Sequence, residues 1–163
     1  MARVLIVPCG GRGCALAREL VAAGHAVRGT TRDPAHAEAI RAAGAEPVVA
    51  DPDRVGTLMG ALAGVTVVCV LLGSAAGDPE QVAALHDGRL RMLWEKLVDT
   101  PVRGVVYETA GTVPADVLAH GRGVAERASD TWHIPLAVLE TDPGGRERWL
   151  ADAAGAVEQL LAP

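Results

Sequence analysis

The sequence predicts an α/β protein built on one doubly wound parallel sheet of six strands, in the order 3-2-1-4-5-6. The first observation is the opening, where an apolar run of strand length (4–7) leads into a glycine-rich turn and then a helical pattern. The second is that strand-like and helical patterns alternate along the whole chain. The third is the run 65–72, whose near-continuous apolar, β-branched content is typical of a central strand covered on both faces.

The individual elements follow from hydrophobic period and from glycine and proline punctuation. Strands are expected at 4–7, 26–30, 46–50, 65–72, 103–108 and 135–140. A first helix carries Leu16, Ala17, Leu20 and Val21 on one face and ends at Gly24. Further helices are expected at 34–43, 54–62, 79–98 (interrupted near Gly88), 115–129 and 146–161. All 163 residues are expected to form one domain, since no linker, repeat or low-complexity tract appears.

The turn after the first strand resembles the G-x-G-x-x-G fingerprint of a dinucleotide-binding Rossmann fold, with Pro8 in place of the first glycine. At Gly10 a side chain would collide with an approaching pyrophosphate, and Gly13 lets the helix pack against the strands. The helix N-terminus offers free N–H groups and a positive dipole end. The residues predicted to bind the phosphates are Cys9, Gly10, Gly11, Arg12, Gly13 and Cys14. The alternative is that the glycines serve only tight packing and nothing binds there.

The end of the second strand bears on the choice of cofactor. Proteins specific for NAD place an acidic residue here, whereas this chain has Thr31 and Arg32. An arginine suits the 2′-phosphate of NADP, so NADP is the predicted cofactor, with NAD the other possibility. The alternative for Arg32 is a solvated charge near a helix start, with Asp33 as the N-cap.

Composition narrows the function classes. The formal net charge of −5 argues against a nucleic-acid partner, and no apolar stretch is long enough to span a bilayer. The chain enters a strand at once, without a secretory leader, so a cytoplasmic location is expected. Abundant Ala, Gly and Arg, with Lys96 as the only lysine, suggest a bacterial source of high GC content.

Cysteine and histidine provide no clear site. The five histidines lack the spacing of metal ligands, so no metal site is predicted. The three cysteines do not form a disulfide framework. Cys9 and Cys14 bracket the glycine turn, which suggests either a redox switch or, as we favour, small side chains filling tight space.

Four stretches carry a family resemblance, and they occur in order within residues 3–111: 17–25, 31–34, 44–51 and 61–73. With them the chain resembles atypical short-chain dehydrogenase/reductase proteins of the epimerase-like and NmrA-like kind. The β-hydroxyacid dehydrogenases share the opening motif but match the later stretches less well. The resemblance implies that Asp51 lies near the adenine and that the end of the fourth strand lies near the cofactor ribose. The residues concerned there are Leu72, Gly73 and Ser74.

The chain departs from that family in its catalytic residues. Reductases of the superfamily typically use a Tyr-x-x-x-Lys pair, but the only tyrosine, Tyr107, has no lysine four residues later. Thr109 stands roughly where the family has its active-site serine, and Glu108 is a candidate base. The alternatives are that Thr109 simply ends a strand and that Glu108 is a solvated or capping carboxylate.

No separate substrate domain is expected within residues 1–163, so short loops after the last three strands are the segments expected to cover a small-molecule substrate. A second subunit would deepen such a pocket, and the face formed by Leu85, Trp94 and Leu97 is a candidate homodimer surface. The alternative is that this face packs on the sheet.

Three functional hypotheses remain open. The first is an NADP(H)-binding protein that acts as an atypical oxidoreductase, passing hydride to a small or flavin-like acceptor. The second is a non-catalytic redox sensor or regulatory protein that binds the dinucleotide. The third, motivated by Pro8, is a degenerate fold that binds no nucleotide.

Overall fold

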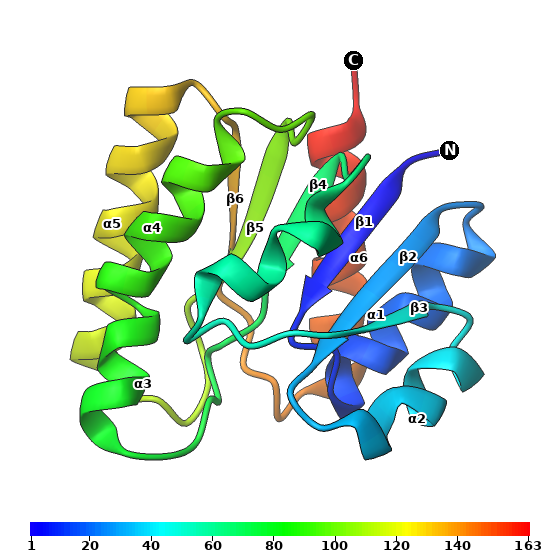
Figure 1. Ribbon diagram of the computed structural model, residues 1–163, viewed down its shortest axis with the longest axis horizontal. Coiled ribbons are helices and arrows are strands. Elements are labelled where there is room, and N and C mark those ends of the chain that lie inside the picture. Colours follow the sequence, from blue (N-terminus) through cyan, green and yellow to red (C-terminus); the bar gives the residue numbers. More distant parts are fainter.

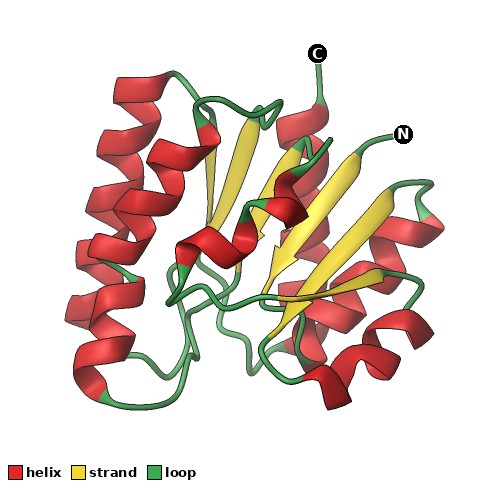
Figure 2. Ribbon diagram, viewed as in Figure 1, coloured by secondary structure: helices red, strands yellow, loops and turns green.

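The computed structural model describes residues 1–163 and contains one parallel sheet in the order β3-β2-β1-β4-β5-β6 (Figures 1 and 2). The predicted fold class and strand order are therefore confirmed. The strands are β1 Arg3–Val7, β2 Ala26–Thr31, β3 Glu46–Val49, β4 Val67–Val70, β5 Gly104–Glu108 and β6 Leu136–Leu139.

The helices lie close to their predicted positions. They are α1 Gly11–Ala22, α2 Ala37–Ala42, α3 Pro79–Leu85, α4 Gly88–Leu97, α5 Ala115–Trp132 and α6 Arg146–Leu161. The interruption expected near Gly88 is present, because α3 ends at Leu85 and α4 begins at Gly88. A 3-10 turn, η1 Pro34–His36, precedes α2, and Asp33 caps it by accepting a hydrogen bond from the N–H of Ala35.

The helix predicted over 54–62 is wrong. This segment forms two 3-10 turns, η2 Val55–Leu58 and η3 Gly60–Leu62. Two glycines weaken any helix here, and the Thr57 hydroxyl bonds the backbone carbonyls of Asp51 and Arg54 instead. The turns still bury Leu58 and Leu62 in the core beneath the sheet.

Two layers of helices cover the two faces of the sheet (Figure 2). On one face α1, α2 and α6 pack against the side chains that β1 and β4 direct to that side. On the other face α4, α5 and the two 3-10 turns pack against the alternate side chains of the same strands. Both clusters are largely aliphatic, with Trp149 in the first and Trp94 in the second.

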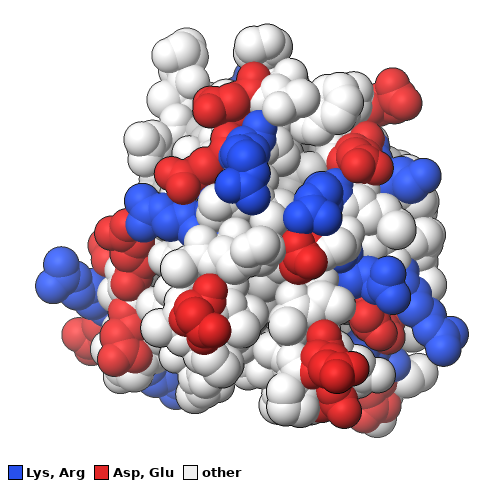
Figure 3. Space-filling model, turned by 90° about the vertical axis from the view of Figure 1, so that its left-hand side faces the viewer, with Lys and Arg blue, Asp and Glu red and all other residues white.

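The homodimer surface proposed from Leu85, Trp94 and Leu97 is wrong. Trp94 is 0 % exposed and Leu97 1 %, and Leu85 packs against the same core cluster. The outer surface of the helix layer formed by α4 and α5 carries interspersed acidic and basic side chains instead (Figure 3). These residues therefore pack on the sheet, as the alternative reading held.

Both chain ends lie at the amino-terminal edge of the sheet (Figure 1). There α6 finishes beside the start of β1 and β2, and the His25 ring contacts Glu158 with 2.6 Å between Nε2 and Oε1. The strands all point away from this edge, so the loops that follow them gather at the opposite edge. None of the helices combines the length and the apolar composition that a membrane span requires.

Candidate functional site

A cleft of about 490 Å³ lies at the carboxyl-terminal edge of the sheet. Its walls come from the loops after β1, β2, β3 and β4, and from α3. In open parallel sheets this edge, at the point where the strand order reverses, is where ligands bind. The order β3-β2-β1-β4 places that reversal between β1 and β4.

Most of the residues predicted to bind a cofactor line this cleft. They are Cys9, Gly10, Arg12, Thr31, Arg32, Asp51, Leu72 and Ser74. The structure brings together the ends of four strands, between Cys9 and Ser74, that are well separated along the chain. The other predicted residues, Gly11, Gly13, Cys14 and Gly73, are not on its surface.

The glycine turn forms an uncapped helix N-terminus at the cleft. Gly10 is the N-cap of α1 without any side-chain cap, and the first helical hydrogen bond runs from Cys14 N to Gly10 O. The N–H groups of Gly11, Arg12 and Gly13 consequently have no partner within the helix. A Cβ at Gly10 would meet nothing within 4 Å, whereas one at Gly13 would lie 3.0 Å from Pro8 O. The packing role predicted for Gly13 is therefore confirmed.

Two contacts that sequence reasoning missed hold this turn in place. His36 Nε2 lies 2.9 Å from Cys9 O, so the loop after β2 is tied to the loop after β1. Gly29 in β2 leaves room for Cys9, since a Cβ there would lie 2.6 Å from the Cys9 Cβ. Gly29 in a strand was the available signal, because a strand glycine often marks a close approach.

Cys9 and Cys14 are buried packing residues. Their sulfur atoms lie 3.9 Å apart, and both residues are buried. Burial and the neighbouring Cys14 raise the pKa of the Cys9 thiol well above its ordinary value. A thiol held protonated in this way is a poor nucleophile, which supports packing over the redox switch.

Arg32 is the unpaired cation of the cleft. Its side chain is exposed, and it forms no ion pair. The nearby carboxylates are engaged by the protein itself: Asp33 caps η1, Asp51 accepts from Asp53 N at 2.9 Å, and Asp53 pairs with Arg89 at 3.2 Å. Arg32 is consequently free to meet an anion at the end of β2.

A buried ion pair between Arg12 and Glu108 borders the cleft. Glu108 is 0 % exposed, and Arg12 donates to both of its carboxylate oxygens, with 3.3 Å between Nη2 and Oε1. The carboxylate also accepts from Gly73 N at 3.0 Å and from Trp149 Nε1 at 2.8 Å. The Arg12 guanidinium lies 4.9 Å from the centre of the Trp149 ring, a cation–π contact. Glu108 therefore joins the first turn of α1 and the loop after β4 to the first turn of α6.

Tyr107 points to the other side of the sheet. Its hydroxyl lies 2.5 Å from His86 Nδ1, and His86 Nε2 donates to Leu72 O at 2.9 Å, so the neutral ring accepts from the tyrosine. Burial lowers the pKa of His86, and burial together with Glu108 raises the pKa of Tyr107. This pair fixes the end of β4, which is part of the cleft wall.

Thr109 lies outside the cleft, in a separate hollow of about 600 Å³ at the ends of β5 and β6. Its hydroxyl donates to Leu139 O at 3.3 Å. The two cavities share no lining residue. The structure thus brings most of the predicted cofactor residues together around one cleft but does not bring Thr109 among them.

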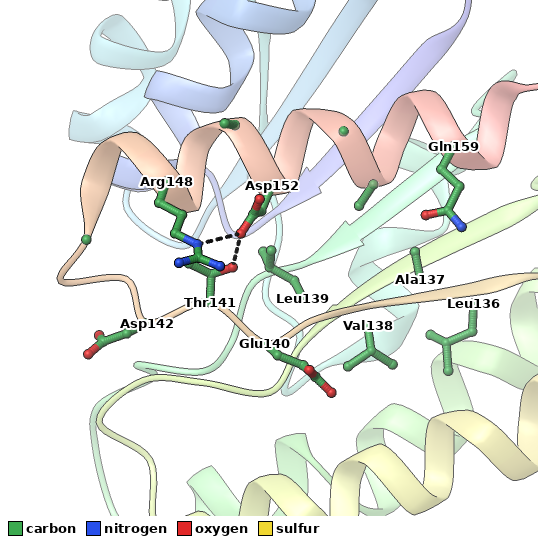
Figure 4. A pocket seen from close by; sticks show the side chains of 14 residues that line it. Leu136, Ala137, Val138, Leu139, Glu140, Thr141, Asp142, Arg148, Asp152 and Gln159 are labelled. Carbon is green, nitrogen blue, oxygen red and sulfur yellow. Dashed lines mark hydrogen bonds and ion pairs between the residues drawn. The ribbon is translucent and has the colours of Figure 1, made fainter.

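The largest groove of the molecule, about 930 Å³, follows the free edge of β6 and the outward face of α6 (Figure 4). It contains none of the predicted site residues. Its charged side chains are partly satisfied among themselves, since Asp152 accepts from Thr141 and pairs with Arg148 (Figure 4). We found no cluster of three potential metal ligands anywhere in the chain.

Comparison with protein families gives one match. A family model described as NAD(P)H-binding matches residues 9–118, which is well over half of the chain. The protein therefore belongs to this NAD(P)H-binding family. The matched segment begins in the glycine turn and includes all of the cleft lining except Pro8. No curated protein sequence matches the chain.

Solved structures with the same fold include epimerases, a reductase and short-chain dehydrogenases. UDP-glucuronic acid 4-epimerase from Bacillus cereus, in complex with NAD, is 14% identical with a TM-score of 0.69, over 86% of this chain and 55% of its own. Triphenylmethane reductase from Citrobacter sp., complexed with NADP(H), is 20% identical with a TM-score of 0.64, over 86% and 49%. A short-chain dehydrogenase from Streptomyces avermitilis is 20% identical with a TM-score of 0.66, over 85% and 65%.

These findings confirm the predicted resemblance to short-chain dehydrogenase/reductase and epimerase-like proteins. The chain is a dinucleotide-binding Rossmann protein whose cofactor is a nicotinamide dinucleotide. It spans about half the length of the first solved structures that it matches.

Proposed function

We propose that this protein binds NADP(H) in the cleft, with the pyrophosphate at the N-terminus of α1 and the 2′-phosphate at Arg32. The observation that carries the choice of NADP is that Arg32 is exposed, lines the cleft and has no carboxylate partner. Charge-assisted hydrogen bonds from a guanidinium to a phosphate are strong, and their geometry is specific. NAD offers only a hydroxyl at that position.

The same geometry favours binding without hydride transfer at Thr109. Its hydroxyl donates to a backbone carbonyl and lies in a different hollow from the predicted cofactor residues. Glu108 is fully buried and accepts hydrogen bonds from Arg12, Gly73 and Trp149. We therefore place the protein in the class of regulatory dinucleotide-binding proteins ahead of the oxidoreductases.

Calorimetric titration with NADPH and NADH tests the cofactor choice. Loss of a charge-assisted phosphate contact costs roughly 1.5–3 kcal/mol, so Arg32→Ala should weaken NADPH binding roughly ten- to a hundred-fold. NADH binding should change less than about three-fold. The matched control is Arg18→Ala, which removes the same charge from an exposed position of α1 that does not line the cleft.

Three outcomes would contradict these proposals. An equal loss for both dinucleotides in Arg32→Ala would refute the 2′-phosphate contact. Absence of binding by either dinucleotide would refute the proposed function as a whole. Steady NADPH oxidation in the presence of carbonyl or flavin acceptors would indicate that the protein is an oxidoreductase and would contradict a purely regulatory role.

A further inference from the structure

The loops after β4 and β5 meet between the cleft and the hollow beside Thr109 and form a wall there. Gly73 and Gly111, from the loops after β4 and β5, approach so closely that a Cβ on Gly111 would lie 2.1 Å from Gly73 O. Val113 N donates to Gly73 O at 3.0 Å, and Thr112 N to the Ser74 hydroxyl at 3.3 Å. These contacts join the two loops along the boundary between the cavities.

The ion pair of Arg12 and Glu108 continues this wall down to the glycine turn. Gly73 belongs to both parts, because its carbonyl bonds the loop after β5 while its N–H bonds Glu108. Removing Arg12 from Glu108 would leave a fully buried carboxylate without its cation, which is strongly unfavourable. A guanidinium has several N–H donors, so Arg12 can meet a phosphate and still hold Glu108. The wall is therefore compatible with an occupied cleft.

The groups suited to anchor an anion are confined to one part of the cleft. The free amides of α1, Arg12 and Arg32 all lie on the side of β1 and β2. The remaining wall, from the loop after β4 and from α3, includes Ala75, Val82 and Leu85 and no charged side chain. Anionic recognition is thus concentrated where an adenosine diphosphate bearing a 2′-phosphate would lie.

From this arrangement we infer that the cleft recognises 2′-phosphorylated adenosine diphosphates as a class, and that the nicotinamide contributes little to affinity. The inference depends on the proposed binding of NADP(H) and specifies which part of that cofactor the cleft recognises. The wall keeps the nicotinamide out of the hollow beside Thr109, so the protein binds the oxidised and reduced cofactors alike. It would respond to how much phosphorylated dinucleotide is present, and not to its redox state.

Competition calorimetry on the whole chain tests the inference with four ligands: NADPH, NADP+, ADP-ribose 2′-phosphate and reduced nicotinamide mononucleotide. ADP-ribose 2′-phosphate and NADP+ should each bind within about three-fold of NADPH. Reduced nicotinamide mononucleotide should not displace NADPH. If NADPH binds ten-fold or more tightly than ADP-ribose 2′-phosphate, about 1.4 kcal/mol, the inference is overturned while the proposed function stands.

A variant in the hollow beside Thr109 gives a second readout. Arg122 lines this hollow with a half-buried side chain and lies across the wall from the cleft, so Arg122→Ala should leave the affinity for NADPH unchanged. A ten-fold loss in this variant would show that the cofactor reaches the hollow, and it would overturn the inference. If neither NADPH nor ADP-ribose 2′-phosphate binds the wild-type protein, the inference and the proposed function both fail.

Discussion

The ion pair between Arg12 and Glu108 should contribute strongly to stability, and Arg12→Leu tests this. Leucine leaves Glu108 buried at 0 % exposure, with only the neutral donors of Gly73 and Trp149. Breaking one side of a buried pair costs about 3–5 kcal/mol. Since the Arg12 side chain is 23 % exposed, water reaches part of the pair, and we expect about 3 kcal/mol.

Thermal and urea unfolding would measure this loss. For a domain of this size, about 3 kcal/mol corresponds to a melting temperature lower by roughly 6–12 °C. The matched control is Arg18→Ala, an exposed arginine of the same helix, for which we expect a change within about 0.5 kcal/mol.

The double variant Arg12→Leu/Glu108→Gln separates an orphaned charge from lost packing. A neutral amide at position 108 has no charge to leave unpaired, so the double variant should be more stable than Arg12→Leu alone. If Arg12→Leu costs less than about 1 kcal/mol, the buried pair does not constrain the loops as we argue. If the double variant is no more stable than the single one, the loss comes from packing, and the electrostatic explanation is wrong.

Three further predictions concern glycines, histidine and cysteine. Gly155→Ala, with nothing within 4 Å of the new Cβ, should raise the free energy of unfolding by up to about 1 kcal/mol. Gly121→Ala should lower it by about 1–3 kcal/mol, because the new Cβ would lie 1.9 Å from the buried Tyr107 hydroxyl. Equal effects of the two substitutions in urea unfolding would contradict this prediction. Because the pKa of His86 is lowered by burial, the unfolded chain binds a proton first, so the free energy of unfolding should fall as the pH drops below about 6.5. This dependence should weaken in His86→Leu and persist in His133→Asn, and an unchanged slope in His86→Leu would refute the assignment. Thiol reagents should modify none of the three cysteines, Cys9, Cys14 and Cys69, in the folded protein and all of them after unfolding. All three are buried, and burial raises the pKa of Cys69 to about 12. Rapid labelling of the native protein would contradict this expectation.

Sequence patterns predicted the sheet well because buried parallel strands have a strong signature. The apolar run ending at Leu72 and the glycine turn near Gly10 fixed the positions of β4 and β1, and strand-order rules then placed their ends together. That juxtaposition was sufficient to predict the part of the cleft that β1, β2 and β4 form. Gly13 also behaved as predicted, because tight helix packing is a local property of the turn.

Long-range polar contacts were not predictable in the same way. Nothing local marks Glu108 as the partner of Arg12 or of Trp149, which are far from it in the sequence. A glutamate at the end of a strand reads as a solvated or capping group, whereas the structure buries it completely. The wall between the cavities depends on this contact and on the approach of two loops, so no periodic pattern contained it.

The helix expected over 54–62 shows a different limit. The segment buries Leu58 and Leu62, but the hydrophobic pattern alone could not choose between an α-helix and successive 3-10 turns. The Thr57 hydroxyl bonds the carbonyls of Asp51 and Arg54, a local contact that competes with helical hydrogen bonds and that apolar spacing does not reveal. For Trp94 the limit is different. An apolar helical face predicts that the side chain is buried, but the pattern does not say whether it packs on the sheet or on a second subunit.

The position of the chain ends has a practical consequence for handling the protein. Both lie at the opposite edge of the sheet from the cleft (Figure 1). An affinity tag, a fluorophore or a sensor surface attached at either end would therefore leave the cleft open to solution. Protein immobilised by either end should bind dissolved nucleotide with the same affinity as free protein. Comparing protein tethered by its N-terminus with protein tethered by its C-terminus therefore checks any binding measurement.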